Sequence, residues 1–417
     1  MATTSSEAAI ASGAPMTASA TIEAARPVVR LSVGRSKRVR LGHPWVYSNE
    51  IEMTEATKRL APGTIAELVD AGDERLGVVT FNPHSLIAAR LMSRDPGAAI
   101  DVGFVEARLA AALALRGALY ETPHYRLVHA EADGLPGLIV DRFGDVFVVQ
   151  LNNAGMDRLS REIAVALETL FKPRAVVLRR DGAVRTLEGL TRVEPELIGT
   201  LDGPIETIEG GVRFLADPLH GQKTGWYFDQ CDNREFAARL ASGRRVLDAY
   251  CHTGGFALRA AAAGASGVVA LDSSESALAL ARQAAVLNGL EARVEFEAGE
   301  AFGALAAQAK AGARYGLVIA DPPSFVKNKK EIAPALRAYR KLTRLSATLV
   351  EPGGFLVVAS CSHHVETMAF LTELHAGLRD AGREGRLLRV AGAGPDHPSH
   401  TALPESAYLK CAALALD

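Results

Sequence analysis

Several side chains that could do chemistry follow directly on apolar runs that the sequence predicts to be buried strands. The run that begins at Val246 ends in Asp248 and opens into the glycine pair Gly254 and Gly255, and the next apolar run ends in Asp272. A glycine has no Cβ, so it permits a sharp turn and lets a ligand approach the backbone closely. A carboxylate can accept both hydrogen bonds of a ribose diol. Two consecutive strands of this kind predict a nucleoside site at the carboxyl edge of a parallel sheet.

The motifs that this region lacks narrow the choice of nucleoside. It contains neither the dinucleotide fingerprint G-x-G-x-x-G nor a phosphate loop ending in Gly-Lys-Ser/Thr. The sequence therefore predicts no loop that would bind a pyrophosphate or a triphosphate. S-adenosyl-L-methionine carries a sulfonium amino acid in place of phosphates, so it is the cofactor that fits best.

A second pair of apolar runs supplies a carboxylate and a thiol. The run at 317–320 is followed by Asp321 and two prolines, and the run at 354–360 delivers Cys361 within Ser-Cys-Ser. A thiolate adds reversibly to a soft carbon such as C6 of cytosine, and this addition makes C5 nucleophilic. We therefore predict Cys361 as the nucleophile, with an inert buried thiol as the alternative. Asp321 is predicted to hydrogen-bond the polar edge of a flipped base, at its exocyclic amine or ring N3.

Taken in order, the glycine turn, the ribose acid, Asp-Pro-Pro-Ser-Phe and Ser-Cys-Ser resemble the class I methyltransferases. More narrowly, the chain resembles the RlmI-like family of 23S ribosomal RNA cytosine-C5 methyltransferases, whose members carry an N-terminal PUA domain. The resemblance extends from about Val28 to the C-terminus. It implies S-adenosyl-L-methionine as cofactor, 23S ribosomal RNA or a pre-50S particle as partner, and a cytoplasmic location.

The resemblance also implies further cofactor contacts. Glu300 stands where the family has an Asp that accepts from the adenine amino group. The segment that contains Asp229 and Arg234 matches one that closes over the methionine end, so these two residues are expected to bind the ammonium and the carboxylate; a salt bridge at a domain boundary is the alternative. Asp248 is expected to face the cofactor, with helix capping as its alternative. The expected cofactor-binding set is Phe228, Asp229, Arg234, Asp248, Gly254, Gly255, Asp272, Glu300 and Asp321.

The chain departs from the two-cysteine RNA cytosine methyltransferases after the prolines. Their second cysteine, which assists product release, is matched here by Ser324. The base that removes the C5 proton is therefore left open. His363, His364 and His397 are candidates by their chemistry alone.

Two local basic clusters could bind RNA. The first lies beside Trp45 and Tyr47 in a predicted exposed loop, and the second follows Asp-Pro-Pro with only Glu331 opposing it. Solvated charged faces are the alternative for both clusters, and a core position is the alternative for Trp45. We expect the two clusters to share one RNA path. The predicted RNA-binding residues are Arg35, Lys37, Arg38, Arg40, Lys327, Arg337, Arg340 and Lys341.

The elements that must position these residues predict an α/β protein of three parts. Residues 27–100, with short strands at 28–33, 65–69, 76–81 and 87–91, predict a PUA-like β-barrel. Residues 101–203 predict a central α+β domain with helices at 105–118 and 156–170. Residues 204–417 predict a hairpin and then uninterrupted strand–helix alternation, which is typical of a Rossmann-like, doubly wound class I methyltransferase domain.

Bulk properties set outer limits on these interpretations. A chain of 417 residues is long for one core, and residues 1–26 read as a disordered tail. No apolar run approaches the ~20 residues of a membrane helix. The four cysteines are widely spaced, so neither disulfides nor a metal site is expected.

Near a Gly-Leu-Pro-Gly turn, Glu131, Asp133 and Asp141 are expected to solvate the turn. The oligomeric state stays open, and a homodimer is compatible with the sequence.

Two other functions remain open at this point. An amino-group methyltransferase acting on N6 of adenine or N2 of guanine would also use Asp-Pro-Pro, although its aromatic residue normally follows the second proline directly and here Ser324 intervenes. A noncatalytic RNA-binding protein of ribosome assembly could retain the same fold. The intact Asp248, Asp272, Asp321 and Cys361 disfavour this last interpretation.

Overall fold

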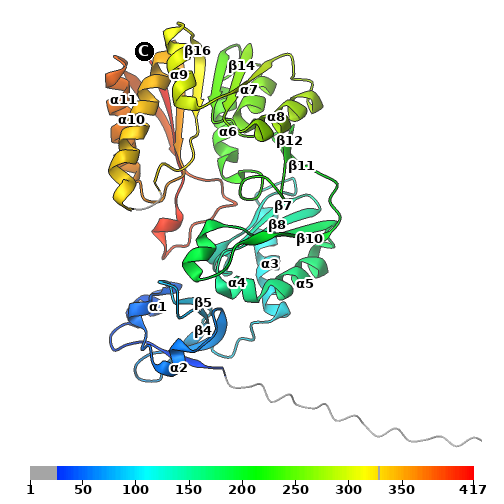
Figure 1. Ribbon diagram of the computed structural model, residues 1–417, viewed down its shortest axis with the longest axis vertical. Helices are drawn as coiled ribbons and strands as arrows, with labels where there is room; N and C mark the ends of the chain where they lie inside the picture. Colours follow the sequence, from blue (N-terminus) through cyan, green and yellow to red (C-terminus); the bar gives the residue numbers. More distant parts are fainter. Residues whose placement is uncertain (1–25, 327–328) are drawn as a thin grey trace, which may run out of the picture.

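A computed structural model describes residues 26–326 and 329–417. Two five-stranded sheets and one seven-stranded sheet, with a two-stranded hairpin, form an elongated molecule (Figure 1). The predicted tail, residues 1–26, lies outside the described residues except for Arg26. Within the described ranges, none of the helices combines the length and the apolarity that a bilayer crossing requires.

The N-terminal sheet has the order β1-β3-β4-β5-β2. An isolated bridge between Leu31 and Ile51 joins its two ends, so the sheet curls into an incomplete barrel. The predicted exposed loop after β1 instead contains a short helix, α1, and a short strand, β2. The elements are β1 (Val28–Arg30), α1 (Lys37–Arg40), β2 (Trp45–Val46), α2 (Glu55–Lys58), β3 (Thr64–Val69), β4 (Arg75–Phe81) and β5 (Ala89–Ser93).

The central sheet has the order β10-β9-β8-β7-β6, and all of its neighbouring pairs are antiparallel except β8 and β9. The predicted helix at 156–170 is two helices, interrupted at the buried Leu159. The elements are α3 (Val102–Gly117), β6 (His124–His129), β7 (Leu138–Phe143), β8 (Val146–Leu151), α4 (Ala154–Arg158), α5 (Ser160–Phe171), β9 (Ala175–Arg180) and β10 (Val193–Gly199).

The two faces of the central sheet belong to different cores. Because side chains alternate along a strand, Phe147 and Val149 of β8 pack with α3 and α5, whereas Val146 and Val148 face the other way. These two valines share one core with Trp226 and the strands that follow it. The central sheet is therefore joined to the C-terminal part by continuous apolar packing.

The C-terminal sheet has the order β15-β14-β13-β16-β17-β19-β18, and its first five strands are parallel. Helices α6, α7 and α8 pack on one face and α9, α10 and α11 on the other, as a doubly wound fold requires. The elements are β11 (Ile205–Glu209), β12 (Val212–Ala216), α6 (Cys231–Arg239), β13 (Arg245–Ala249), α7 (Gly255–Ala262), β14 (Gly267–Asp272), α8 (Glu275–Leu287), β15 (Val294–Ala298), α9 (Ala301–Lys310), β16 (Tyr315–Ala320), α10 (Ile332–Leu349), β17 (Val350–Ser360), α11 (Thr367–Asp380), β18 (Gly385–Ala391) and β19 (Lys410–Leu416).

The predicted strand–helix alternation fails after α11. Strand β19 is antiparallel to both β17 and β18, and no helix of the alpha type separates β18 from β19. The connection, residues 392–409, runs down between the parts of the molecule, and we call it the C-terminal strap (red in Figure 1). The strap contacts the central part, because Arg116 donates to the carbonyl oxygen of Asp396 (2.8 Å) and the Arg126 backbone N–H donates to the Asp396 carboxylate (2.9 Å).

The prediction that three acids near residue 134 solvate a turn holds only for Asp133, which accepts from the His129 backbone N–H (2.6 Å) at the start of the turn. Asp141 is fully buried and receives both arms of the Arg126 guanidinium (2.7 and 2.9 Å). Asp133 likewise pairs with the fully buried Arg116, and Glu131 accepts a hydrogen bond from the Trp45 indole (2.8 Å). These carboxylates are partners of groups distant in sequence or in another sheet, which the local turn motif does not reveal.

Candidate active site

The carboxyl ends of the parallel strands bring most of the predicted residues to one edge of the sheet. Asp272 ends β14, Asp321 follows β16, and Cys361 follows β17. The strand order reverses between β13 and β16, and ligands of doubly wound sheets bind at such a switch point. The sequence therefore predicted the correct edge for these three side chains.

The turn after β13 has an unusual backbone. Tyr250, His252 and Gly254 all have positive φ values (66°, 50° and 85°). For a residue other than glycine this conformation costs on the order of 1–3 kcal/mol, and such strain clusters at ligand sites. The His252 backbone N–H donates to one Asp272 oxygen and the Ser274 N–H to the other (both 2.8 Å). Each oxygen keeps a free lone pair for a ribose hydroxyl.

The glycines at 254 and 255 also allow close packing within the protein. A Cβ at Gly254 would lie 3.2 Å from the Cβ of Ala281, and one at Gly255 would lie 3.1 Å from Cδ of Arg234. The missing side chains therefore allow the turn to pack tightly against α8 and α6. The positive φ of Gly254 is the sharp turn that the sequence predicted.

Asp248 is fully buried beneath this turn. One oxygen accepts from the Ala257 N–H (2.8 Å) at the start of α7, and the other has no partner within the part of the chain that the structure describes. Burial raises the pKa of Asp248 well above its usual value. One oxygen therefore has the capping role that was the alternative for Asp248, and the other oxygen has no partner among the described residues.

Two of the remaining cofactor candidates, Glu300 and Phe228, lie in different surroundings. Glu300 is exposed at the start of α9, and its charge, with that of Asp272, acts on the phenol of Tyr250. Phe228 instead packs in the core against Phe143, with ring centroids 5.1 Å apart. Its side chain therefore does not reach the carboxyl edge.

Arg234 is already paired. Its buried guanidinium donates to both oxygens of Glu209 (2.7 and 2.5 Å), donates to the Tyr227 carbonyl oxygen (2.9 Å) and stacks on Trp226. The expected contact with the methionine carboxylate is therefore replaced by the salt-bridge alternative, which here links the β11–β12 hairpin to α6.

Asp229 has one occupied and one open oxygen. The Tyr408 hydroxyl donates to one oxygen (2.5 Å), while the other is buried without a partner among the described residues. Burial opposes ionisation, but the charges of His397 and Lys223 and the Tyr408 hydroxyl outweigh it, so the pKa of Asp229 lies below its usual value. The open oxygen is an anionic acceptor without a donor.

Asp321 and Cys361 both have raised pKa values, and the charge of Asp321 acts on the Cys361 thiol. Burial raises the pKa of Asp321 to about 7, and the neighbouring Asp229 carboxylate adds to the rise. Burial also raises the pKa of the partly exposed Cys361 thiol to about 11; the charge of Asp321 contributes, and Lys223 opposes it. Two groups with perturbed pKa values at a strand edge are typical of a catalytic site.

Lys223 and Tyr227 are functional candidates that the sequence analysis did not single out. Lys223 has φ 51°, and its ammonium lies 4.9 Å from the centroid of the Tyr227 ring. Burial raises the pKa of Tyr227, as do the charges of Asp229, Asp321 and Cys361. Both residues belong to the segment before α6, where a polar and aromatic run without periodicity was the available signal.

Comparisons with known proteins identify the family. A profile for S-adenosylmethionine-dependent methyltransferases matches residues 181–388, and one for PUA-like domains matches residues 29–94. The Ribosomal RNA large subunit methyltransferase I of Erwinia tasmaniensis is 36% identical over 385 residues, or 91% of this chain and 97% of that protein. The protein of that name from Escherichia coli strain UTI89 has the same identity and coverage. The chain belongs to this methyltransferase family.

Solved structures agree on the fold. A Streptococcus mutans protein assigned as a SAM-dependent methyltransferase superposes with a TM-score of 0.78 at 18% identity, covering 93% of this chain and all 100% of that one. A second methyltransferase structure, complexed with SAH, has a TM-score of 0.77, also at 18% identity, and covers 94% and 100% of the two chains.

S-adenosylmethionine is the cofactor of this methyltransferase family. The residues at the carboxyl edge fit it, because Asp272 keeps lone pairs for a ribose diol and the strained turn lies beside it. The N-terminal incomplete barrel is the family's PUA-like domain.

The basic segment of the PUA-like domain uses part of its charge internally. Arg40 pairs with Asp70 and Glu74, and Arg38 approaches Glu50 (3.3 Å). Arg35 and Lys37 are exposed.

In the second basic cluster, too, some cations form ion pairs within the protein and others are exposed. Arg340 forks onto Asp380 of α11 (2.5 and 2.8 Å), whereas Arg337 and Lys341 are exposed on α10. Lys327 lies outside the described residues. In Figure 1, α1 and α10 lie on the same side of the view with the C-terminal strap between them.

The histidine candidates remain unassigned. The rings of His363 and His364, after Cys361, contact each other at a tilt of 45° with centroids 3.8 Å apart, and burial lowers the pKa of His363. His397 is buried in the strap against Asp396 (2.7 Å).

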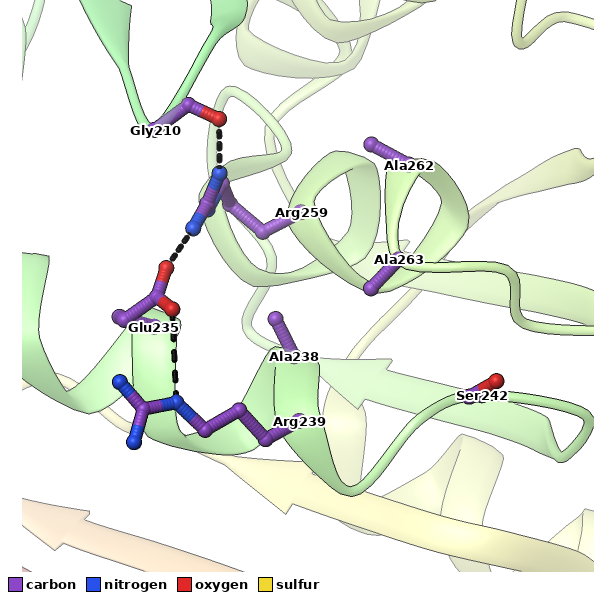
Figure 2. A pocket seen from close by; sticks show the side chains of 8 residues that line it. All are labelled: Gly210, Glu235, Ala238, Arg239, Ser242, Arg259, Ala262 and Ala263. Atoms are coloured by element: carbon purple, nitrogen blue, oxygen red, sulfur yellow. Dashed lines mark hydrogen bonds and ion pairs between the residues drawn. The ribbon is translucent and has the colours of Figure 1, made fainter.

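A cavity of about 260 Å³ lies away from all of these residues, between α6, α7 and the β11–β12 hairpin (Figure 2). Arg259 spans it from the Gly210 carbonyl oxygen to Glu235. None of the predicted site residues lines it.

Proposed function

We propose that the protein forms 5-methylcytosine in large-subunit ribosomal RNA, with Cys361 as the nucleophile. The names of its relatives and its PUA-like domain support ribosomal RNA as the substrate. The observation that carries the cysteine mechanism is the position of Cys361. It is partly exposed at the end of β17, on the strand next to Asp321, and the charge of Asp321 contributes to the raised pKa of the thiol.

The proposed chemistry begins with a proton. Because the pKa of Asp321 is raised to about 7, this carboxyl group can take or give a proton near neutral pH. Asp321 accepts the thiol proton and passes it to N3 of the ring as the sulfur bonds to C6. The electrons of the C5–C6 double bond then form an enamine, and C5 becomes the nucleophile. C5 would then bond to the methyl group that bound S-adenosylmethionine supplies, and the donor sulfur would keep the electrons of the broken S–CH3 bond. Loss of the C5 proton to a base and cleavage of the C6–S bond restore the C5–C6 double bond, and the proton on N3 returns through Asp321 to the departing thiolate.

The donor site is proposed at the strained turn and β14. S-adenosylmethionine, when bound, supplies an electrophilic methyl group on sulfonium. Asp272 accepts from the ribose hydroxyls, and Tyr250 and Glu300 lie on the adenine side of the site. The close packing of Gly254 and Gly255 holds this turn in position.

An amino-group methyltransferase is disfavoured by Phe325. Such an enzyme needs an aromatic ring after the prolines to stack on its base. Here Phe325 packs against Tyr339, with ring centroids 4.9 Å apart, and lies near Phe302. The Ser324 hydroxyl donates to the Val326 carbonyl oxygen (2.9 Å), which holds the loop in this course.

The division of labour follows the three parts expected from the sequence. Residues 27–100 form the proposed RNA-binding domain, 101–203 the central domain and 204–417 the methyltransferase domain. A noncatalytic assembly factor would retain the fold, but it would have no use for a partly exposed thiol at the end of the strand next to a carboxyl group of raised pKa.

The test is a Cys361→Ser variant assayed on ribosomal RNA that contains 5-fluorocytosine at the target. The parent is expected to form a covalent complex, because fluorine cannot leave as a proton does. The variant is expected to bind donor and RNA yet to form neither the complex nor 5-methylcytosine, since an unactivated hydroxyl is rarely ionised near neutral pH. Methylation by the variant would rule out the thiol mechanism.

A further inference from the structure

A polar pocket lies between the central sheet and the methyltransferase part. Its volume is about 180 Å³. At roughly 30 Å³ per water molecule, it holds the equivalent of about six waters, which is the scale of one pyrimidine ring. Its walls come from three separate stretches of the chain. The lining residues are Arg126, Gln150, Lys223, Trp226, Tyr227, Asp229 and Tyr408.

The central sheet directs Gln150 toward this pocket. Gln150 is two residues beyond Val148 on β8, so both side chains lie on the same face of the sheet. That face packs against the methyltransferase part, because Val148 shares a core with Trp226. The Gln150 amide has no hydrogen-bond partner within residues 26–326 and 329–417, so its donors and its acceptor are available to a ligand.

The opposite wall presents an acceptor and a cation. The open oxygen of Asp229 is buried without a donor, and a buried carboxylate oxygen in this condition is costly unless a ligand satisfies it. Lys223 is held in a strained backbone conformation, and its charge acts on Asp229, Asp321 and Cys361. Lys223, which lines the pocket, is therefore near enough to the proposed nucleophile for its charge to lower the pKa of the thiol.

Hydrogen bonds across the junction fix these walls relative to one another. The Thr224 hydroxyl donates to Asp141 of β7 (2.6 Å), which also holds the guanidinium of Arg126. Tyr408, from the C-terminal strap, holds Asp229. A ligand in the pocket thus meets groups that are already in place, which reduces the cost of ordering them.

We propose that this pocket binds the Watson–Crick edge of the target cytosine and that the central domain therefore takes part in base recognition through Gln150. The open oxygen of Asp229 accepts from the exocyclic amine, while Lys223 and the Gln150 amide donate to O2. The proposal rests on the proposed function, because it needs a cytosine that presents C6 to Cys361. It assigns Asp229 to the substrate instead of to the methionine end of the donor.

The arrangement favours cytosine over uracil. Cytosine presents a donor at N4 and acceptors at N3 and O2, whereas uracil presents an acceptor at O4 and a donor at N3. An ionised Asp229 would face the O4 of uracil without a proton between them. The lost hydrogen bond and the unpaired buried carboxylate would together disfavour uracil.

The test compares Gln150→Leu and Lys223→Met with matched controls on exposed helix positions, Gln283→Leu on α8 and Lys310→Met on α9. The substrate is large-subunit ribosomal RNA from cells that lack the gene, and the donor probe is S-adenosylhomocysteine in calorimetry. Each pocket variant is expected to raise KM for RNA about tenfold or more, the amount that corresponds to one lost charged or buried hydrogen bond. The affinity for S-adenosylhomocysteine is expected to stay within about twofold of the parent, and the controls to match the parent throughout.

Two results would overturn the proposal. Weaker S-adenosylhomocysteine binding with an unchanged KM for RNA would assign the pocket to the donor. Pocket variants that match their controls in both measurements would leave it as solvent-filled space. Mass spectrometry of the RNA product of the parent distinguishes this inference from the proposed function. An absence of 5-methylcytosine would overturn the proposed function itself. Its presence, together with unaffected variants, would overturn only the pocket assignment. If Lys223→Met has a clearly lower melting temperature than the parent, Gln150→Asn, which keeps an amide group in the pocket, provides a milder test.

Discussion

At the scale of single residues, the thiol of Cys361 is protonated in the ligand-free protein at neutral pH. Its pKa is raised to about 11, so at pH 8 roughly one thiol in a thousand is ionised. Because the thiolate is the nucleophile, alkylation of Cys361 by iodoacetamide is expected to accelerate about tenfold per pH unit from pH 7 to about 10. Peptide mass spectrometry of timed samples measures this rate, with Cys361→Ser identifying the peptide. A rate that levels off near pH 8.5 would contradict the raised pKa.

Asp272 offers a second test at this scale. Asp272→Asn removes the charge but keeps one acceptor for the His252 N–H, so the turn is expected to stay folded. A hydrogen bond to a charged group is worth about 1.5–3 kcal/mol, so S-adenosylhomocysteine is expected to bind roughly ten- to hundredfold more weakly. Calorimetry gives the affinity, and thermal melting checks the fold. Binding as tight as that of the parent would remove Asp272 from the donor site.

The residues that the sequence predicted well follow their strands directly. Asp272, Asp321 and Cys361 could be assigned to one edge because parallel strands end together. Gln150 and Tyr408 could not, because they reach the pocket through a sheet face and a strap that belong to other parts of the chain. For the same reason the sequence could not decide between a ligand and a salt bridge for Arg234, whose partner Glu209 lies in a hairpin 25 residues earlier.

At the scale of elements, α10 joins the sheet to the proposed RNA path. Its buried side supplies Tyr339 and Leu342 to the core, and its exposed side carries Arg337 and Lys341. Arg340 is committed to Asp380, so it is expected to contribute less to RNA binding than its charge alone suggests.

We therefore predict that Arg337→Gln with Lys341→Gln weakens RNA binding and flattens its salt dependence. Each phosphate contact on a single strand contributes about 0.7 to the slope of log K against log salt, so the loss of two contacts lowers it by about 1.4. Filter binding at several salt concentrations measures the slope. Lys310→Gln with Arg314→Gln removes the same charge where α9 ends and β16 begins, and it is the control. Equal slopes for both double variants would make α10 an ordinary solvated face.

Secondary structure in the parallel part could be predicted because each strand is an apolar run followed by a helix. The antiparallel direction of β18 and β19 could not be predicted in this way. A strand at the edge of a sheet can run parallel or antiparallel to its neighbour, and its sequence does not indicate the direction. The incomplete N-terminal barrel was expected from its short strands, but the brief helix α1 within the basic segment was not.

At the scale of the whole molecule, the parts are linked by buried polar contacts as well as by apolar packing. The strap holds the central part through Asp396, and it also passes close to the PUA-like domain, because a Cβ added at Gly42 would lie 4.0 Å from the Cβ of Ala402. A substrate that spans the PUA-like domain and the carboxyl edge would therefore meet a surface whose parts are already oriented. The sequence could predict the order of the three parts, but not these contacts, because each joins residues that are distant in the chain.

The junction between the PUA-like and central parts centres on Glu188. This buried carboxylate accepts hydrogen bonds from Ser85 (2.7 Å), Asn82 (3.1 Å) and Arg90 (2.8 Å) of the PUA-like domain. Burial alone would raise its pKa, but Arg90 and the two neutral donors outweigh burial and hold the pKa below its ordinary value of 4.5. A carboxylate whose pKa is lower in the folded state stabilises the fold above its unfolded pKa and loses that effect as the pH falls through the folded one.

Glu188→Gln is therefore expected to lower the free energy of unfolding by about 1.5–3 kcal/mol at pH 7, the worth of one hydrogen bond to a charged group. Because protonated Glu and Gln are both neutral, the difference from the parent is expected to stay constant above about pH 6 and to narrow as the pH falls below 4.5. Urea denaturation across this range measures it, with the exposed Glu194→Gln as the matched control. A difference that grows at acid pH would mean that Glu188 is not held ionised by Arg90, and the junction would then owe its stability to apolar packing instead.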